Sequence, residues 1–354
     1  MIQCMHLVQE GVGILVKNQV IDFVIPWVDG SDSVWLAEKN KYLQELEKDT
    51  YGSFWIDAGD NRYRDWGNLH YWFRAVEKYA PWVNRIHLIV WRDVPDWLQT
   101  EHPKLHIVRH ADYIPADCLP VFSSHPIELN MHRIPGLAEQ FVYFNDDMFL
   151  TAPVRPEDFF RNGIPCDTFA MNAIYFGKDS VGPINGNNVS IINDHFPKKD
   201  ALKKNWMKYF SPVNGLKNLV RSGLLIFWPW FPGFLYSHTS TNLLKSTMET
   251  VWDLEKDALD KTCSDRFRQQ TNVNQWLFKY WQLAEGNFVP VTSKDKRCYH
   301  IKESIEEACD SVVNRKFKIL CINDTGMTTD FEDKAKKIQE AFEKALPDKS
   351  KFEL

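Results

Sequence analysis

Short runs of apolar residues alternate along the chain with longer segments in which apolar positions recur every three or four residues. The runs are rich in β-branched and aromatic side chains, whereas the longer segments have the period of an α-helix. Strands are therefore expected at residues 20–28, 85–90, 104–110, 141–144 and 316–322, and helices at residues 33–49, 66–80, 126–134, 243–257, 271–286 and 331–342. This alternation predicts an α/β fold with a mostly parallel, Rossmann-like (GT-A-like) sheet.

Polar residues follow three of these strands at the point where each is expected to leave the sheet. Asp29 and Gly30 end the first run, the triplet Asn-Asp-Asp (145–147) follows FVYF, and Asn-Asp (323–324) follows the last strand. Ligands of such sheets bind beyond the carboxyl ends of the strands. These three groups are therefore expected to line a binding site.

The texture of the sequence changes between residues 176 and 237, which are expected to form an insertion. A stretch with seven Lys and Arg residues leads to GLLIFWPWFPGFLY (223–236), which has no charge and contains two prolines. This run is too short and too broken to span a bilayer. Beside the basic residues it fits a surface that rests among lipid headgroups, and a loop buried under the insertion is the alternative.

The amino-acid composition limits the classes of partner and indicates the cellular compartment of the protein. The formal charge of −5 over 354 residues argues against nucleic acid as a partner, because phosphate binding requires a basic face. Aromatic residues make up 14% of the chain, and their rings suit stacking on sugars or contact with a membrane interface. The seven cysteines include no CxxC pair, and the first residues do not resemble a signal peptide. A cytoplasmic protein is expected, with peripheral contact to the inner face of the cell membrane through residues 198–236 as a further hypothesis.

Asn145, Asp146 and Asp147 are the first candidates for chemistry. Neighbouring carboxylates after a buried strand lose hydration unless something positive binds them. Oxygen ligands of this kind suit Mg²⁺ or Mn²⁺, which can share them with a diphosphate. The alternative is a solvated turn, because Asp and Asn are common turn residues.

The residues that follow the first strand form a second candidate site. Asp29 and Asp32 supply carboxylates, Gly30 allows a ligand to approach the backbone closely, and Trp27 could cover a base or a ribose. A strand-ending turn followed by a helix cap explains the same residues equally well.

Arginines and histidines are weaker candidates when each is taken alone. Arg64 and Arg268 could grip phosphate through paired hydrogen bonds, although a single arginine is more often a surface residue. Glu128 and His132 lie four residues apart, a spacing that serves packing as often as catalysis. His238 has no feature that separates it from a structural histidine, and Asp65 is expected to cap the second helix.

Together and in this order, the segments resemble one family. The Stealth proteins have signature blocks similar to IDFVIPWVDGSD, RYRDWGNLHYWFRAVEKYAPWV, RIPGLAEQFVYFNDDMFL, the region from SHTSTNLLK to FRQQTNVN, and ILCIND. These proteins are sugar-phosphate transferases that build capsular and related surface polysaccharides in bacteria, with an animal N-acetylglucosamine-1-phosphotransferase as a relative. The resemblance implies transfer of hexose 1-phosphate from a nucleotide sugar to a hydroxyl of an acceptor glycan, with release of a nucleoside monophosphate.

The resemblance also implies roles for single residues. The substrate-binding residues would be Trp27, Asp29, Gly30, Asp32, Arg64, Asp65, Asn145, Asn272 and Asn323. The catalytic residues would be Asp146, Asp147, Arg268 on the diphosphate and His238 as general base, since a neutral imidazole is available near pH 7. The cation, Mg²⁺ or Mn²⁺, would be held by Asp146, Asp147 and Asp324.

The same resemblance divides the chain into four parts. A variable preface (1–20) is followed by a Rossmann-like donor-binding core (21–175), the insertion (176–237), and a helical catalytic segment with the closing strand and helix of the core (238–354). The insertion would meet a lipid-linked acceptor. Two other functions fit the residues: a metal-dependent glycosyltransferase, which would release a nucleoside diphosphate, and a non-catalytic carbohydrate-binding protein of a capsule-assembly complex.

Overall fold

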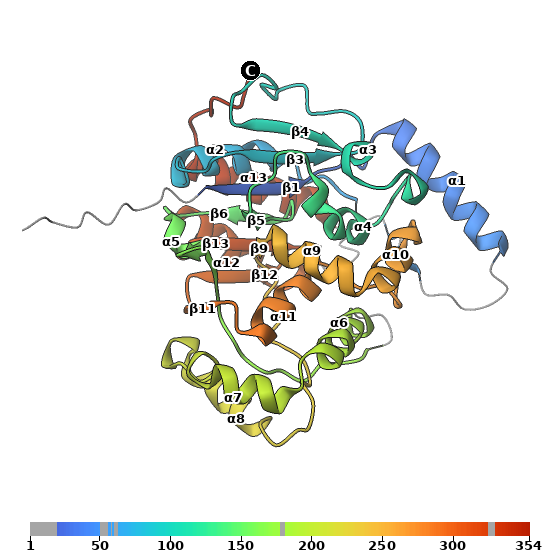
Figure 1. Ribbon diagram of the computed structural model, residues 1–354. Coiled ribbons are helices and arrows are strands. Elements are labelled where there is room, and N and C mark those ends of the chain that lie inside the picture. Colours follow the sequence, from blue (N-terminus) through green and yellow to red (C-terminus); the bar gives the residue numbers. More distant parts are fainter. Residues whose placement is uncertain (1–19, 50–55, 58, 60–62, 178–180, 325–329) are drawn as a thin grey trace, which may run out of the picture.

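The computed structural model of the chain describes residues 20–49, 56–57, 59, 63–177, 181–324 and 330–354 (Figure 1). The preface expected at residues 1–20 therefore lies outside the described residues, apart from Val20.

A five-stranded sheet runs through the centre of the molecule (Figure 1). Its strands, in spatial order, are β4 (Leu105–Arg109), β3 (Ile86–Val90), β1 (Ile21–Pro26), β5 (Gln140–Tyr143) and β9 (Thr241–Leu244). The first four are parallel, and β9 runs antiparallel to β5. The strand order reverses between β1 and β5, as in doubly wound nucleotide-binding sheets. The predicted α/β fold with a mostly parallel sheet is confirmed.

Helices cover both faces of the sheet. Successive side chains of β1 point to opposite faces, so they pack into two different apolar clusters. Phe23 and Ile25 belong to one buried apolar cluster, and Val24 belongs to another. The helices that contribute to the first cluster include α2 (Leu69–Tyr79), α12 (Ile301–Val313) and α13 (Phe331–Ala345), and those of the second include α4 (Ser124–Leu129), α9 (Lys245–Leu254) and α11 (Trp276–Glu285).

A second, three-stranded sheet lies beside the central one. It consists of β12 (Lys296–His300), β13 (Ile319–Asn323) and β6 (Met148–Leu150), with β6 antiparallel to β13. Because β6 begins directly after Asp147, the turn formed by residues 145–147 joins the two sheets. The backbone N–H of Ile322 donates to the carbonyl of Asp147 at 2.8 Å. The closing strand of the chain is thereby fixed against this turn.

Three local predictions are wrong. Asp65 does not cap the second helix, because α2 begins at Leu69 and the Asp65 carboxylate instead accepts from the N–H of Gly67. Residues 243–244 are not helical, because they belong to β9 and pair with β5. The segment 126–134 is not one helix, since α4 ends at Leu129 and a separate 3₁₀ turn (Met131–Arg133) follows.

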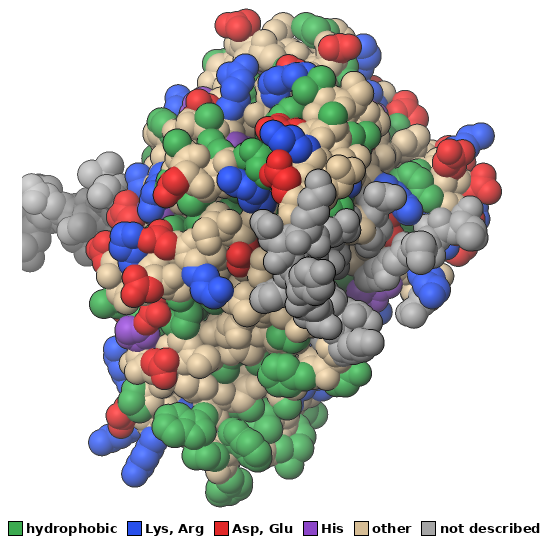
Figure 2. Space-filling view, turned by 90° about the vertical axis from the view of Figure 1, so that its right-hand side faces the viewer, with side chains coloured by type: hydrophobic (Ala, Val, Ile, Leu, Met, Phe, Trp, Pro, Cys, Tyr) green, Lys and Arg blue, Asp and Glu red, His purple; other side chains and the backbone are tan. Residues whose placement is uncertain are grey.

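The described part of the insertion contains the α-helices α6 (Gly182–His195), α7 (Lys198–Tyr209) and α8 (Leu216–Leu224), which gather below the sheets in Figure 1. Phe227, Trp228 and Trp230 follow α8 and are 93%, 59% and 57% exposed. The alternative of a buried loop is therefore wrong for these three residues. Figure 2 shows hydrophobic side chains gathered at this lower end of the molecule. None of the helices described is both long and apolar enough to cross a bilayer.

Candidate active site

The two acidic segments predicted from sequence lie side by side, beyond the carboxyl ends of the neighbouring strands β1 and β5. The parallel register pairs Val24 of β1 with Tyr143 of β5, and the N–H of Phe144 still donates to the carbonyl of Val24 at 2.9 Å. Residues 27–32 and 145–147 therefore leave the sheet at the same level, where the strand order reverses. Open α/β sheets bind ligands at this position.

Asp147 is the point at which distant segments meet. Its Oδ2 lies 3.2 Å from Nε2 of His238, accepts a hydrogen bond from Nδ2 of Asn323 at 3.1 Å, and lies 3.3 Å from Sγ of Cys321. Its other oxygen, Oδ1, is buried and has no hydrogen-bond partner among the described residues. A buried carboxylate oxygen without a donor is what a bound cation would satisfy.

Asp147 and His238 favour the charged form of each other. Burial alone would raise the pKa of Asp147, but the charge and hydrogen bond of His238, together with Cys321 and Asn323, lower it. Burial alone would lower the pKa of His238, but the Asp147 carboxylate raises it. Each group therefore favours the charged form of the other, and the expected neutral imidazole near pH 7 stays a prediction. The Nδ1 atom of His238 lies 3.2 Å from the hydroxyl of Tyr236.

Asp146 is crowded by other carboxylates. Its side chain reaches solvent, yet burial within the surrounding protein raises its pKa to about 7, and Asp147 and Asp65 contribute to the rise. Burial also raises the pKa of Asp65, and Asp29 adds to that effect. Trp27 donates to Asp65 from Nε1 at 3.4 Å. Four carboxylates thus act on one another in series, an arrangement that a divalent cation would relieve.

Asp324 has a different neighbour from the one expected of a metal ligand. One of its carboxylate oxygens lies 3.7 Å from Nη1 of Arg64, whose guanidinium lies over the ring of Phe331. Asn323, one residue earlier, contacts Asp147 instead. The structure therefore pairs two predicted site residues, Arg64 and Asp324, with each other.

The contacts of Asp29 and Asp32 are those of a turn and a helix cap. Asp29 Oδ1 accepts from the N–H of Ser31 at 2.8 Å. Asp32 Oδ1 accepts from the N–H of Val34 at 2.8 Å and so caps α1 (Ser33–Asp49). The cap alternative therefore describes Asp32, whereas Asp29 also acts on Asp65.

Gly30 is explained by packing against the backbone. A Cβ atom at this position would lie 1.7 Å from the carbonyl oxygen of Tyr63. Any larger residue would push the segment that begins at Tyr63 away from the turn. This contact accounts for the glycine, and the expectation that Gly30 lets a substrate approach the backbone closely stays a prediction.

Arg268 lies on β10 (Arg268–Gln269), which pairs with β2 (Ile56–Asp57). Its Nη2 donates to Oγ of Ser124 at 3.2 Å. Burial raises the pKa of Tyr236, Asp147 raises it further, and Arg268 opposes the rise. Arg268 and Asp147 therefore both act electrostatically on the hydroxyl of Tyr236.

Asn272 makes hydrogen bonds within its own loop, and its predicted substrate contact stays a prediction. It is 1% exposed. Its Oδ1 accepts from the N–H of Gln269 at 2.8 Å, and its Nδ2 donates to Asp265 at 2.7 Å. These bonds shape the loop that carries Arg268.

Sequence reasoning gave no role to several residues of the site. Tyr143 donates from its hydroxyl to Asn145 and, at 3.2 Å, to the buried carboxylate of Glu128. Burial raises the pKa of Glu128 and Arg268 opposes it. Tyr143 and Asn145 lie two residues apart, as do Cys321 and Asn323, so the period of a strand could have linked each pair. His132 lies outside this network, against the ring of Trp252.

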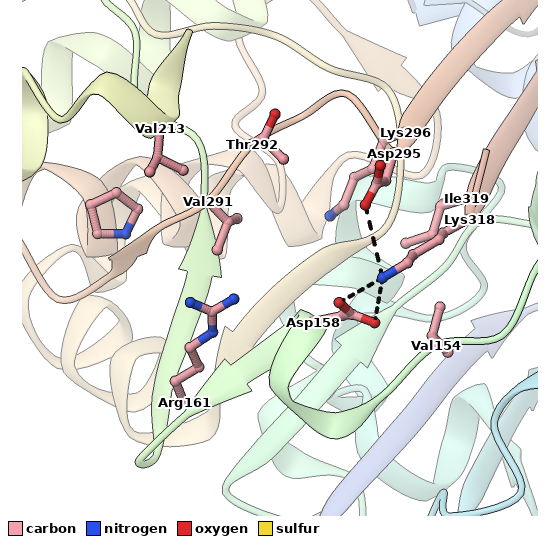
Figure 3. A pocket seen from close by; sticks show the side chains of 11 residues that line it. Val154, Asp158, Arg161, Val213, Val291, Thr292, Asp295, Lys296, Lys318 and Ile319 are labelled. Atoms are coloured by element: carbon pink, nitrogen blue, oxygen red, sulfur yellow. Dashed lines mark hydrogen bonds and ion pairs between the residues drawn. The ribbon is translucent and has the colours of Figure 1, made fainter. Parts of the chain in front are cut away.

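A cavity of about 220 Å³ lies elsewhere in the molecule (Figure 3). Lys318 pairs with two acids of its lining, with Nζ 2.8 Å from Asp158 and 3.8 Å from Asp295, and Val213 of the insertion contributes to its wall. The predicted site residues do not line this cavity. The candidate site is therefore defined by the contacts around Asp147.

Comparison with known proteins gives matches over nearly the whole chain. Two family models match: Stealth protein CR1, conserved region 1, over residues 19–47, and Stealth protein CR2, conserved region 2, over residues 62–167. The chain is 42% identical over 338 residues to the capsular polysaccharide phosphotransferase WcwK of Streptococcus pneumoniae, covering 94% of this chain and 99% of the relative. It is 41% identical to the receptor polysaccharide phosphotransferase WefC of Streptococcus oralis, with the same coverage.

Among solved structures, the galactosyltransferase LgtC in complex with donor and acceptor sugar analogs matches with a TM-score of 0.36 and 10% sequence identity. The match covers 93% of this chain and 98% of that chain. A TM-score this low does not establish a common fold.

Proposed function

Because this chain belongs to the Stealth family of polysaccharide phosphotransferases, we propose that it transfers hexose 1-phosphate from a nucleotide sugar to a hydroxyl of an acceptor glycan. The acceptor oxygen forms a bond to the phosphorus that carries the hexose, and the bond from that phosphorus to the bridging oxygen of the diphosphate breaks. A nucleoside monophosphate leaves, and the product is a phosphodiester of a cell-surface polysaccharide. The observation that supports this most is the meeting of Asp147, His238 and Asn323 beside Asp146 at the edge of the sheet.

His238 is the proposed general base. The acceptor hydroxyl must lose its proton as it attacks phosphorus. Asp147 holds Nε2 of the imidazole, which leaves Nδ1, beside the hydroxyl of Tyr236, to take that proton. Since Asp147 raises the pKa of His238, the imidazole must first release the proton that the pair favours. The proposed reaction should therefore become faster as the pH rises through that pKa.

Asp146 and Asp147 are the proposed holders of Mg²⁺ or Mn²⁺. The buried Oδ1 of Asp147 and the raised pKa of Asp146 both fit a site that accepts positive charge. When bound, the cation supplies positive charge to the phosphoryl group in transfer. Arg268 is proposed to contact the donor diphosphate, and Trp27 to contact the donor nucleotide within a core formed by residues 21–175.

Product analysis tests this proposal. The purified protein is incubated with Mg²⁺, a panel of nucleotide sugars and an acceptor glycan, and the released nucleotide is identified. Release of the monophosphate, with the donor's second phosphorus recovered in the glycan, is expected. Release of the diphosphate would support a glycosyltransferase instead, and glycan binding without turnover of any donor would support the carbohydrate-binding alternative.

We also propose that the acceptor is lipid-linked and that the insertion rests on the cytoplasmic face of the membrane. Exposed apolar side chains of the insertion include Leu216, Leu224, Phe227, Trp228 and Trp230, and the exposed lysines in its described part are Lys199, Lys203, Lys204 and Lys217. An apolar surface with lysines nearby fits an anionic lipid surface. Lys198 is not part of that charge, because it is buried and donates from Nζ to the carbonyls of Leu225 at 2.6 Å and Trp228 at 2.5 Å. It fixes the exposed loop.

A further inference from the structure

Two cysteines adjoin the Asp147–His238 pair, and the proposed transfer uses neither. Cys298 of β12 and Cys321 of β13 are direct partners in the parallel register, and each thiol acts on the pKa of the other. Cys321 Sγ lies 3.3 Å from the same oxygen of Asp147 that faces His238. Both cysteines are free thiols.

The spacing of these atoms is close to that of a tetrahedral metal site. One ligand atom each from Asp147, His238 and Cys321 lie within 4.8 Å of one another. Zinc bonds of about 2.0–2.3 Å to oxygen, nitrogen and sulfur imply ligand-to-ligand edges of roughly 3.3–3.8 Å. The two contacts of Asp147 Oδ2, 3.2 Å to nitrogen and 3.3 Å to sulfur, are near this range. Little movement would be needed to enclose an ion.

The contacts are also directed as metal binding requires. His238 and Cys321 both point at Oδ2 of Asp147, so an ion placed between these atoms would replace the hydrogens that now lie there. Cys298, the partner of Cys321 in the parallel register, lies outside this group of three and would have to shift towards the ion to supply a fourth ligand. Asn323 would remain a donor to the Asp147 carboxylate, as residues that hydrogen-bond to metal ligands do in known sites.

The ligand chemistry selects the ion. Two thiolates, an imidazole and a carboxylate oxygen suit Zn²⁺, whereas Mg²⁺ and Mn²⁺ prefer oxygen ligands such as those of Asp146. We infer that Asp147, His238, Cys298 and Cys321 form a second cation site, specific for a thiophilic divalent ion such as Zn²⁺. Each ion bound displaces the two thiol protons and, from the imidazolium form of His238, the proton on Nε2.

Occupation of this site would stop the proposed reaction. It would fix Nε2 of His238 to the ion and make Nδ1 a poor proton acceptor, and it would engage Asp147 at the same time. The inhibition rests on the proposed function, whereas the binding does not.

Cobalt substitution tests the binding without any substrate. Metal-free, reduced protein is titrated with Co²⁺, whose thiolate complexes absorb in the near ultraviolet and whose tetrahedral complexes absorb strongly in the visible. Both absorptions are expected to reach their maximum at one equivalent of Co²⁺ per protein, and added Zn²⁺ should abolish them. Cys298→Ser should weaken the near-ultraviolet absorption and Cys321→Ser should remove most of it. The matched control Cys309→Ser, on α12, should keep both.

Each result decides part of the inference. A wild-type protein that shows no thiolate absorption, or a Cys298→Ser, Cys321→Ser double variant with unchanged spectra, overturns the site. Circular dichroism identifies a variant that fails to fold. If Cys321→Ser fails to fold, the comparison uses only Cys298→Ser, because Cys298 is half-buried and its replacement disturbs the core less. Zn²⁺ that displaces Co²⁺ but leaves turnover with Mg²⁺ unchanged overturns only the inhibition. If no sugar phosphate is transferred at all, the spectra still report on the site.

Discussion

At the scale of single residues, Asp147 has the most connected side chain of the candidate site. It meets groups that lie 91, 174 and 176 positions away in the chain. Replacing it would release His238, Cys321 and Asn323 together, so a loss of turnover would not separate their roles. Asp146 and His238 allow sharper tests, because each can be changed with one measurable consequence.

Asp146→Asn should stabilise the metal-free protein at alkaline pH. The pKa of Asp146 is about 7 in the fold, against an ordinary value of 3.8. A raised pKa in the folded state means that stability is fully present below 3.8 and is lost as the pH rises through about 7. Asparagine carries no charge at any pH and avoids this loss. The melting temperature in a chelator should therefore exceed that of the wild type at pH 8, and the gap should narrow towards pH 5.

Asp253→Asn, at an exposed position on α9, is the control and should change little at either pH. A melting temperature for Asp146→Asn at or below that of the wild type at pH 8 would contradict the assigned crowding of charge. Addition of Mg²⁺ should stabilise the wild type more than the variant, since the variant lacks one proposed ligand.

His238→Ala should reduce the turnover number by roughly 10²–10⁴-fold, the usual contribution of a general base. Its donor affinity, measured by calorimetry, should stay within a few-fold of the wild type. Because Asp147 raises the pKa of His238, wild-type turnover should rise with pH through that value, and the residual activity of the variant should lack this rise.

His195→Ala is the matched control, because His195 also pairs with a carboxylate, that of Glu255, away from the site. It should retain turnover and its dependence on pH. If His238→Ala instead lost donor affinity in proportion to turnover, His238 would be a ligand contact and the base would have to be sought elsewhere.

At the scale of elements, sequence patterns predicted what burial determines. The strands β1 and β3 are buried along most or all of their length, so their apolar runs were readable. The last two residues of β9, Leu243 and Leu244, were predicted to be helical, because they continue the apolar spacing of α9 and only pairing with β5 makes them extended. Asn323 was predicted near the acids from its place after a strand. Cys321 was not, because its contact depends on the register between β6 and β13.

The exposed apolar end of the insertion leads to a prediction about lipid binding. The double variant Trp228→Ser, Trp230→Ser should lose flotation with liposomes that contain anionic lipid, because two exposed rings no longer enter the headgroup region. Wild-type flotation should weaken as salt is raised, since the lysines nearby contribute by charge. Leu254→Ser, at an apolar position on α9 that is 54% exposed, is the control. Unchanged flotation of the double variant would contradict the proposed membrane contact of the insertion.

At the scale of the whole molecule, the last residues of the chain close the fold against its first half. Arg74 of α2 donates from Nε and Nη2 to the carboxylate of Glu353, each at 2.9 Å. The two side chains are only 9% and 5% exposed. Leu354 donates to the carbonyl of Trp97 at 2.8 Å, one position beyond Glu353. Stability of the sheet that carries the site therefore depends on a contact 279 positions apart in sequence.

Glu353→Gln should lower the free energy of unfolding by up to about 3 kcal/mol at pH 7, because it leaves the Arg74 guanidinium buried with less opposing charge. Burial alone would raise the pKa of Glu353, but the hydrogen bonds from Arg74 and Ser350 lower it below the ordinary 4.5. A lowered pKa in the folded state means that the stabilisation is present above 4.5 and is lost as the pH falls through the lowered value. Urea unfolding should therefore separate wild type and variant clearly at pH 7 and bring them together as the pH falls below 4.

Glu340→Gln, at an exposed position on α13, should unfold like the wild type throughout. Since Glu353 lies outside the network around Asp147, turnover of the folded variant at low temperature should be retained. A variant as stable as the wild type at pH 7 would mean that Glu343, 3.1 Å from Nη1 of Arg74, is sufficient to balance the charge.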